Sequence, residues 1–142
     1  MFKSSSMAGN ILGFQGSYPA VLTSDSTGLT IDRMPQSGGQ QGYDSAAVTL
    51  STGASVGSGN YARITVEHSN DSGSNFVALN DAQTGTQYVS GTIGSQSVVT
   101  IDVDLSAARR YVRFNTDVTI GGTSLACAMV AALCGAKVEP VQ

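Results

Sequence analysis

The segment Val99–Leu105 reads VTIDVDL and alternates apolar and polar residues without interruption. A period of two places successive side chains on opposite faces of a β-strand, so Val99, Ile101 and Val103 are predicted to point inward. The following segment, 111–118, is rich in aromatic and β-branched residues, which also favour strands. Both segments therefore predict strands with one buried face.

Strand patterns recur upstream of these segments. Apolar residues alternate with polar ones in 46–50 and in 61–67. The second of these runs is followed by the turn residues 70–73 and by an apolar run at 75–79, which together predict a hairpin. A further strand is predicted at 86–90.

Residues 125–134 form the last predicted element. They are Ala-rich but few in number and apolar on both faces, which favours a buried strand over a helix. Cys127 and Cys134 are seven positions apart, about 23 Å along a strand or about 10 Å along a helix. A disulfide needs Cα atoms within about 7 Å, so both thiols are expected to be reduced and buried.

The strand pattern predicts an all-β protein. Short strands separated by turns at roughly 8–12-residue intervals are typical of a β-sandwich, of jelly-roll or immunoglobulin-like type. The chain of 142 residues has room for one such domain. The predicted inward-facing residues of its core are Ile64, Val66, Val99, Ile101, Val103 and Val112.

Residues 1–44 differ from the rest of the chain. They contain turn clusters, two prolines and little periodicity, which predicts an extended N-terminal arm ahead of a sandwich domain at 45–142. Such a segment cannot build its own core, so it is expected to lie on the domain, on a neighbouring subunit or on another partner. Its candidate partner contacts are the apolar residues Ile11, Leu12, Val21, Leu22, Leu29 and Ile31.

The composition excludes several classes of partner. Charged residues make up 12% of the chain, against about 25% in typical proteins. The net charge is −3 with seven Lys and Arg, which argues against nucleic acid and anionic membranes as partners. No apolar run approaches the ~20 residues of a membrane-spanning helix. Neither nucleic acid nor a membrane is therefore expected as a partner.

Three of the few basic residues are clustered at Arg109, Arg110 and Arg113. The simplest interpretation is a salt-bridged sheet surface that faces Asp102, Asp104 or Asp117. The alternative is a contact with an acidic protein partner, made by Arg109 and Arg113, which share a face of the predicted strand. Both interpretations are open at the level of the sequence.

Candidate catalytic groups do not form a complete set. Residues 122–126, Gly-Thr-Ser-Leu-Ala, resemble the nucleophile motif of subtilisin-like proteases, but the aspartate and histidine motifs of that family are missing. The single histidine, His68, lies beside a predicted turn, so Ser124 has no base to activate it. We therefore expect a structural or binding module rather than an enzyme.

Metal and cofactor sites are not predicted. Asp102 and Asp104 share one face of a strand, but the apolar alternation makes it the solvent face. The turn 70–75 has oxygen-bearing side chains at alternate positions but lacks the acidic residues of an EF-hand loop. We expect a plain hairpin turn, no metal and no cofactor.

Three pieces after Tyr61 form a recognisable series: 64–76, 99–106 with 109–113, and 130–136 followed by Pro140. In these pieces the chain resembles small virion proteins of tailed bacteriophages, whereas residues 1–44 have no match. The resemblance implies a capsid-associated decoration or cement protein with a β-sandwich body. It implies the major capsid protein as partner, a homo-oligomer such as a trimer, and a location in the virion after assembly in the host cytoplasm.

A physical argument points the same way, because a cement protein needs a rigid body and exposed contacts but no chemistry. The alternative is a carbohydrate-binding module or receptor-binding tail module. Sugar binding generally uses aromatic platforms, and this chain has no tryptophan. Its five tyrosines are scattered, at Tyr18, Tyr43, Tyr61, Tyr88 and Tyr111.

Overall fold

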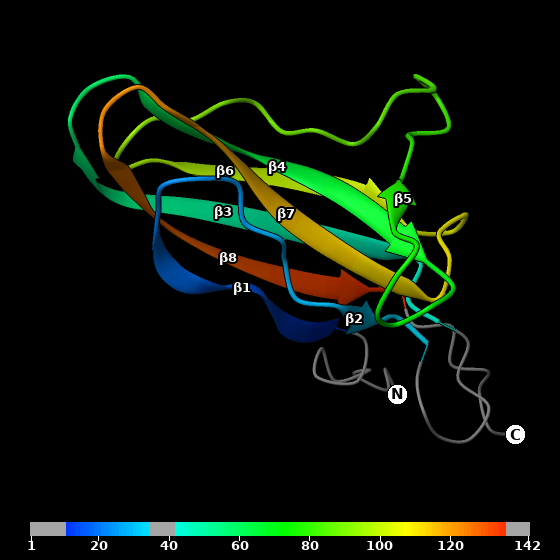
Figure 1. Cartoon of the computed structure of the whole chain (residues 1–142). Helices are drawn as coiled ribbons and strands as arrows, with labels where there is room; N and C mark the ends of the chain where they lie inside the picture. The colour runs from blue at the N-terminus through cyan, green and yellow to red at the C-terminus, as the bar shows by residue number, and fades with distance from the viewer. Residues whose placement is uncertain (1–10, 35–41, 136–142) are drawn as a thin grey trace, which may run out of the picture.

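The computed structural model describes residues 11–34 and 42–135. They form two four-stranded antiparallel sheets, sheet A with strand order β1-β8-β3-β6 and sheet B with order β2-β7-β4-β5. The two layers can be followed in Figure 1, where β7 of sheet B runs diagonally across β3 of sheet A. The strands are β1 (Ile11–Leu22), β2 (Ile31–Asp32), β3 (Ser45–Val56), β4 (Asn60–Ser69), β5 (Val77–Ala78), β6 (Val98–Asp104), β7 (Tyr111–Ile120) and β8 (Ser124–Cys134).

The predicted β-sandwich is confirmed, and its strand order is that of an eight-stranded jelly roll. The predicted hairpin is also confirmed, since Glu67 pairs with Ala78 and His68 with Val77. Residues 125–134 belong to a strand, as the sequence predicts. The strand predicted at 86–90 is wrong, because this segment makes isolated bridges rather than a continuous ladder.

The core lies between the two sheets and matches most of the predicted residues. Ile64, Val66, Val103 and Val112 are at most 1% exposed. Val99 and Ile101 pack against this core but are half-buried. Their strand, β6, lies at the edge of sheet A, so one flank of each side chain remains open to solvent.

The N-terminal residues belong to the sandwich from residue 11 onward. β1 pairs with β8 at nine positions and forms an edge strand of sheet A. Ile31 on β2 is 3% exposed and lies in the core. The boundary predicted between residues 44 and 45 therefore does not separate an arm from a domain in the described part of the chain.

The segment between β1 and β2 is fastened to β7. The backbone N–H and C=O groups of Ser26 and Thr116 exchange two hydrogen bonds of 2.9 Å each. The Gly28 N–H donates to Asn115 Oδ1 at 2.9 Å, and the Val118 N–H donates to Asp25 Oδ1 at 2.7 Å. This segment covers part of the β7 edge beyond β2 and satisfies backbone groups there.

Arg33, which follows β2, is hydrogen-bonded to the loop that precedes β7. Its guanidinium donates to the carbonyls of Arg109 at 2.8 Å and Tyr43 at 3.1 Å, and also to the carbonyl of Ala108. Arg110 donates in turn to Asp32, with Nη2 to Oδ2 at 2.8 Å. Burial lowers the pKa of Arg33 below its ordinary value, although the group remains charged at neutral pH.

One buried hydroxyl in the core has no partner among the described residues. Thr116 is fully buried on β7, and its Oγ1 makes no hydrogen bond there. We expect Thr116→Val to raise the free energy of unfolding by about 1 kcal/mol, because the shape is kept and an unsatisfied polar group is removed. Urea unfolding measures the change. Thr116→Ser, which keeps the hydroxyl and removes the methyl group, is the control and is expected to lower stability by about 1 kcal/mol.

Candidate functional site

His68 has a structural environment. Its Nδ1 accepts a hydrogen bond of 3.1 Å from the Arg109 N–H. Burial lowers the pKa of His68, and the nearby charges of Arg109 and Arg33 lower it further. The imidazole is therefore neutral at pH 7 and holds the loop before β7, which agrees with a strand-end histidine.

Ser124 is a buried strand residue at the start of β8. Its carbonyl accepts a hydrogen bond of 2.9 Å from Asn60 Nδ2. The same amide donates to the Val56 carbonyl at 3.0 Å, and Asn60 Oδ1 accepts from the Gly122 N–H at 2.8 Å. Residues 122–126, which resemble a protease motif, therefore lie where the β3–β4 turn is hydrogen-bonded to the β7–β8 turn.

The acidic candidates are engaged in turns or face solvent. Asp71 accepts hydrogen bonds from the Gly73 N–H at 3.0 Å and from Ser74 Oγ at 2.7 Å, and these bonds lower its pKa. Asp102 and Asp104 are both exposed on β6, as predicted. Within residues 11–34 and 42–135, no group of three or more His, Cys, Asp or Glu residues could hold a metal ion.

The cysteines lie on opposite faces of β8 and are not joined by a disulfide. Cys127 is buried in the core, and burial raises the pKa of its thiol. Cys134 is half-buried on the outer side of the strand, so the expectation that both thiols belong to the core is wrong for this residue. The odd spacing, which alternates sides along a strand, explains the difference.

The outer face of sheet B carries charged residues in pairs across its two long strands. Glu67 lies opposite Arg113, and Arg63 lies opposite Asp117. Arg113 Nε donates to Glu67 Oε2 at 2.6 Å, and its guanidinium lies 4.0 Å from the centre of the Phe76 ring. The predicted salt-bridged surface is thus present, with Glu67 rather than Asp102, Asp104 or Asp117 as the partner of Arg113.

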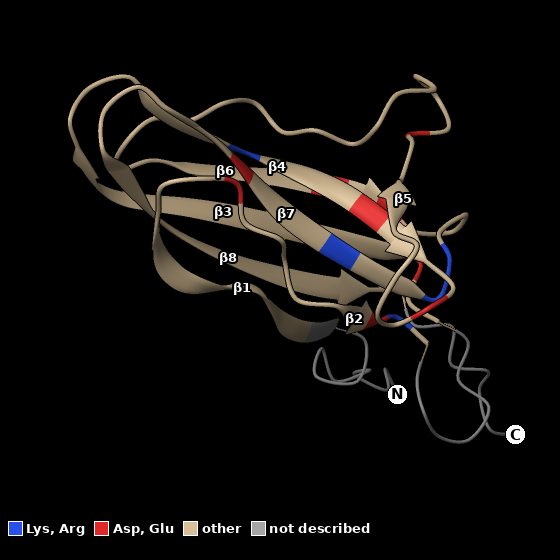
Figure 2. Ribbon diagram, in the orientation of Figure 1, with Lys and Arg blue, Asp and Glu red and all other residues tan. Residues whose placement is uncertain are grey.

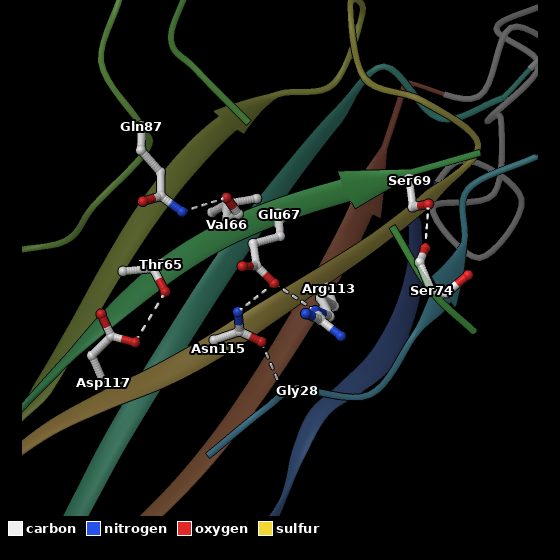
Figure 3. Close-up of polar contacts among 10 residues, drawn as sticks. All are labelled: Gly28, Thr65, Val66, Glu67, Ser69, Ser74, Gln87, Arg113, Asn115 and Asp117. Carbon is white, nitrogen blue, oxygen red and sulfur yellow. Dashed lines mark hydrogen bonds and ion pairs between the residues drawn. The ribbon is translucent and has the colours of Figure 1, made fainter. Parts of the chain in front are cut away.

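Figure 3 shows how this face is tied to the N-terminal segment. Asn115 Nδ2 donates to Glu67 Oε2 at 2.9 Å, while Asn115 Oδ1 accepts from the Gly28 N–H. Thr65 Oγ1 donates to Asp117 Oδ1 at 3.2 Å, and Gln87 Nε2 donates to the Val66 carbonyl at 2.9 Å. Many polar side chains of sheet B therefore make hydrogen bonds within the protein.

The eight candidate partner contacts fall in different environments. Ile31 lies in the core and Arg113 in an ion pair, so neither side chain is free for a partner. Leu22 and Leu29 are half-buried, whereas Val21 and Arg109 are exposed. The side chains of Ile11 and Leu12 lie outside the described part of the structure, and only their backbone positions in β1 are described.

Sheet A has a solvent-facing side of a different kind. Its neighbouring strands β1, β8 and β3 contain no charged residue, and Figure 2 shows them free of the colours that mark acidic and basic residues on β4 and β7. We call the outer side of these three strands, with its continuation onto Val98 and Thr100 of β6, the uncharged face. Its cross-strand rows are Gln15–Val130–Thr49–Thr100, Gly13–Ala132–Ala47 and Ala128–Ser51–Val98.

Two shallow cavities open on the uncharged face. One, of about 520 Å³, is lined by 19–21, 51–53 and 126–128. The other, of about 420 Å³, is lined by 13–15 and 130–132 together with Ala47 and Thr49. Both are lined largely by small side chains such as Ala, Gly and Ser, and Val130, which is 56% exposed, lines the second cavity. Sequence reasoning missed this face, since only strand order brings the three strands together.

A third cavity, of about 270 Å³, lies on sheet B and is polar. Arg63 and Asp117 form an ion pair in its wall, with Nη2 and Oδ2 3.5 Å apart. Asp25 lines another side, and Tyr61, which is 47% exposed, contributes an aromatic ring. Such a site can exchange hydrogen bonds with a small polar ligand.

The chain matches no protein-family model, and no curated protein matches it at a significant level. The described residues contain no helix long and apolar enough to cross a membrane. The function must therefore be argued from the two faces of the sandwich and from their chemistry.

Proposed function

We propose that this protein is a virion structural protein that decorates and stabilises the head shell of a tailed bacteriophage, with the major capsid protein as partner. The observation that carries the proposal is the broad outer side of sheet A, whose strands β1, β8 and β3 carry no charged residue. Such a surface is suited to burying protein area. The candidate catalytic groups, by contrast, are held in turns, ion pairs and strand junctions.

The fold and the resemblance support this proposal by analogy. Jelly rolls occur in viral capsid proteins and in lectins, so the architecture alone does not select a function. The three segments that resemble virion proteins form β4 with its turn, β6 with β7, and the end of β8. β4, β7 and β8 are inner strands of their sheets and β6 is an edge strand of sheet A, so the resemblance concerns the body rather than a peripheral loop.

Co-sedimentation with empty phage heads tests the proposed function. The purified protein is expected to pellet with heads in a saturable manner. Arg109, whose side chain is exposed, is the candidate contact for an acidic shell surface, so Arg109→Gln is expected to weaken binding about tenfold at low salt. Arg63→Gln, the same change on an exposed strand residue, is the control. Absence of the protein from the pellet at every ratio would exclude a shell-binding role.

The polar cavity of sheet B favours a second candidate, a carbohydrate- or receptor-binding tail module. Its aspartates, its arginine and the ring of Tyr61 offer the donors, acceptors and stacking surface that a saccharide uses. A glycan array separates the two candidates. Under this second function, Arg63→Gln abolishes binding and Arg109→Gln leaves it unchanged, the reverse of the pattern expected with heads.

A further inference from the structure

The uncharged face exposes three large apolar side chains to solvent. Val21 is 67% exposed, Val98 is 64% exposed and Val130 is 56% exposed. They lie among alanine, glycine, serine and threonine residues, and no charged residue of β1, β8 or β3 opposes association. Exposed apolar side chains on a broad surface without charges are typical of a protein interface.

We propose that the occupant of the uncharged face is a second copy of this chain, packed face to face across a two-fold axis at Met129. This residue is the midpoint of β8, which runs from Ser124 to Cys134. An axis that crosses the strand there lays β8 of one copy antiparallel over β8 of the other. The two sheets then overlap along the full length of β8, in the aligned packing that sandwiches use.

The shape of the face is complementary to itself under this operation. Position 130 of one copy lies over position 128 of the other, because the axis passes through position 129. The exposed side chain of Val130 therefore enters the cavity beside Ala126 and Ala128 of the second copy. The operation repeats this contact, so each copy places one valine in a cavity of about 520 Å³ on the other copy.

The charges of the face are compatible with the same axis. Asp102 and Asp104 are the acidic residues on the outer side of β6, and they lie level with Ala132 and Cys134 of β8. After the two-fold operation, no β6 residue of the second copy lies over Asp102 or Asp104. The carboxylates of the two copies thus stay at opposite ends of the interface, and Val98 lies over Thr100 instead.

The available area suffices for a specific dimer. Three strands of about 11 residues, with the 98–100 part of β6, spaced about 4.8 Å apart with about 3.3 Å per residue, cover about 570 Å² on each copy. The total of about 1,100 Å² lies at the lower limit for specific protein interfaces. The dimer is therefore expected to dissociate on dilution rather than to be permanent.

Sedimentation velocity over a concentration series tests the proposal on the isolated full chain. The parent protein is expected to shift from monomer to dimer as concentration rises. Val130→Asp is expected to raise the dissociation constant by at least about a hundredfold, because the two-fold axis buries the new carboxylate twice. Val77→Asp is the matched control, since Val77 is a 45% exposed valine on β5 of the other sheet, and it is expected to dimerise like the parent.

A second variant keeps the test informative if Val130→Asp does not fold. Ser51 is exposed on β3, so Ser51→Arg keeps the fold of the monomer while placing a bulky cation in the same interface. Circular dichroism checks that both variants are folded. The proposal is overturned if the parent stays monomeric at all concentrations, or if folded Val130→Asp and Ser51→Arg still form dimers.

The proposed dimer and the proposed shell-binding function can be contradicted independently of each other. Sedimentation of the isolated protein needs no phage heads, and co-sedimentation with heads needs no dimer. A monomeric parent that binds heads, and loses this binding on Val130→Asp, would assign the uncharged face to the shell protein. That outcome contradicts the second copy as occupant and leaves the proposed function standing.

Discussion

Deletion of residues 1–32 is expected to abolish cooperative folding. The deletion removes β1 and β2, and with them the apolar side chains of Phe14, Leu22 and Ile31 that lie in or against the core. Full burial of such a side chain contributes roughly 1.5–3 kcal/mol; Ile31 is buried, whereas Phe14 and Leu22 are half-buried. The combined loss is a large part of the stability of a typical domain, about 5–15 kcal/mol. The loss also leaves the hydrogen-bonding edge of β8 unpaired along nine positions.

Thermal unfolding followed by circular dichroism and size-exclusion chromatography measures the effect. The truncated chain is expected to show no sharp transition and to aggregate through the opened edge of β8. A chain that lacks residues 1–10 keeps every described strand and is the control for shortening. A truncated chain that unfolds as sharply as the parent would show that 11–32 act as a dispensable arm, the role that the sequence alone suggests.

Gly28→Ala is expected to lower the free energy of unfolding by about 3 kcal/mol, a shift of about 10 °C in Tm. A Cβ atom at this position would lie 1.9 Å from the Phe114 carbonyl oxygen and 2.9 Å from the Gly16 carbonyl oxygen. Neither obstacle is the flexible end of a side chain. The segment must therefore move away from β7, which also breaks the hydrogen bond from the Gly28 N–H to Asn115.

Gly13→Ala is the matched control for this prediction. Gly13 lies on β1, and a Cβ atom there would have no neighbour within 4 Å. Its stability is expected to stay within about 1 kcal/mol of the parent, because alanine also restricts the unfolded chain. Urea unfolding of both variants gives the comparison. Equal stabilities for the two would show that the segment before β2 is loosely held.

The strands that the sequence predicted well are those whose burial alternates regularly. In β4, Ile64 and Val66 follow the period of two and lie in the core. This alternation is local, since it depends on the direction of successive side chains along one strand. Partners in space need not be known, so β4, β6 and β7 could be found from their own residues.

β1 was not predicted as a strand, and the reason is also local. Its ladder with β8 has irregularities between Gln15 and Ser17 and between Ser17 and Ala20. Each irregularity changes which side the following residues face, so the apolar residues of β1 lose their period. Pro19 adds a turn signal inside the strand, where an edge position tolerates it. Pairing with β8 is what makes this segment a strand.

The all-β class, most of the core and the lack of charge in three separated segments, 11–22, 45–56 and 124–134, follow from the amino-acid sequence. That these segments are neighbours in one sheet, and that Arg113 pairs with Glu67, became clear from the folded arrangement. The physical reason is that alternation is encoded residue by residue, whereas adjacency depends on hydrogen bonding between strands about a hundred positions apart. The uncharged face exists only once that pairing has formed.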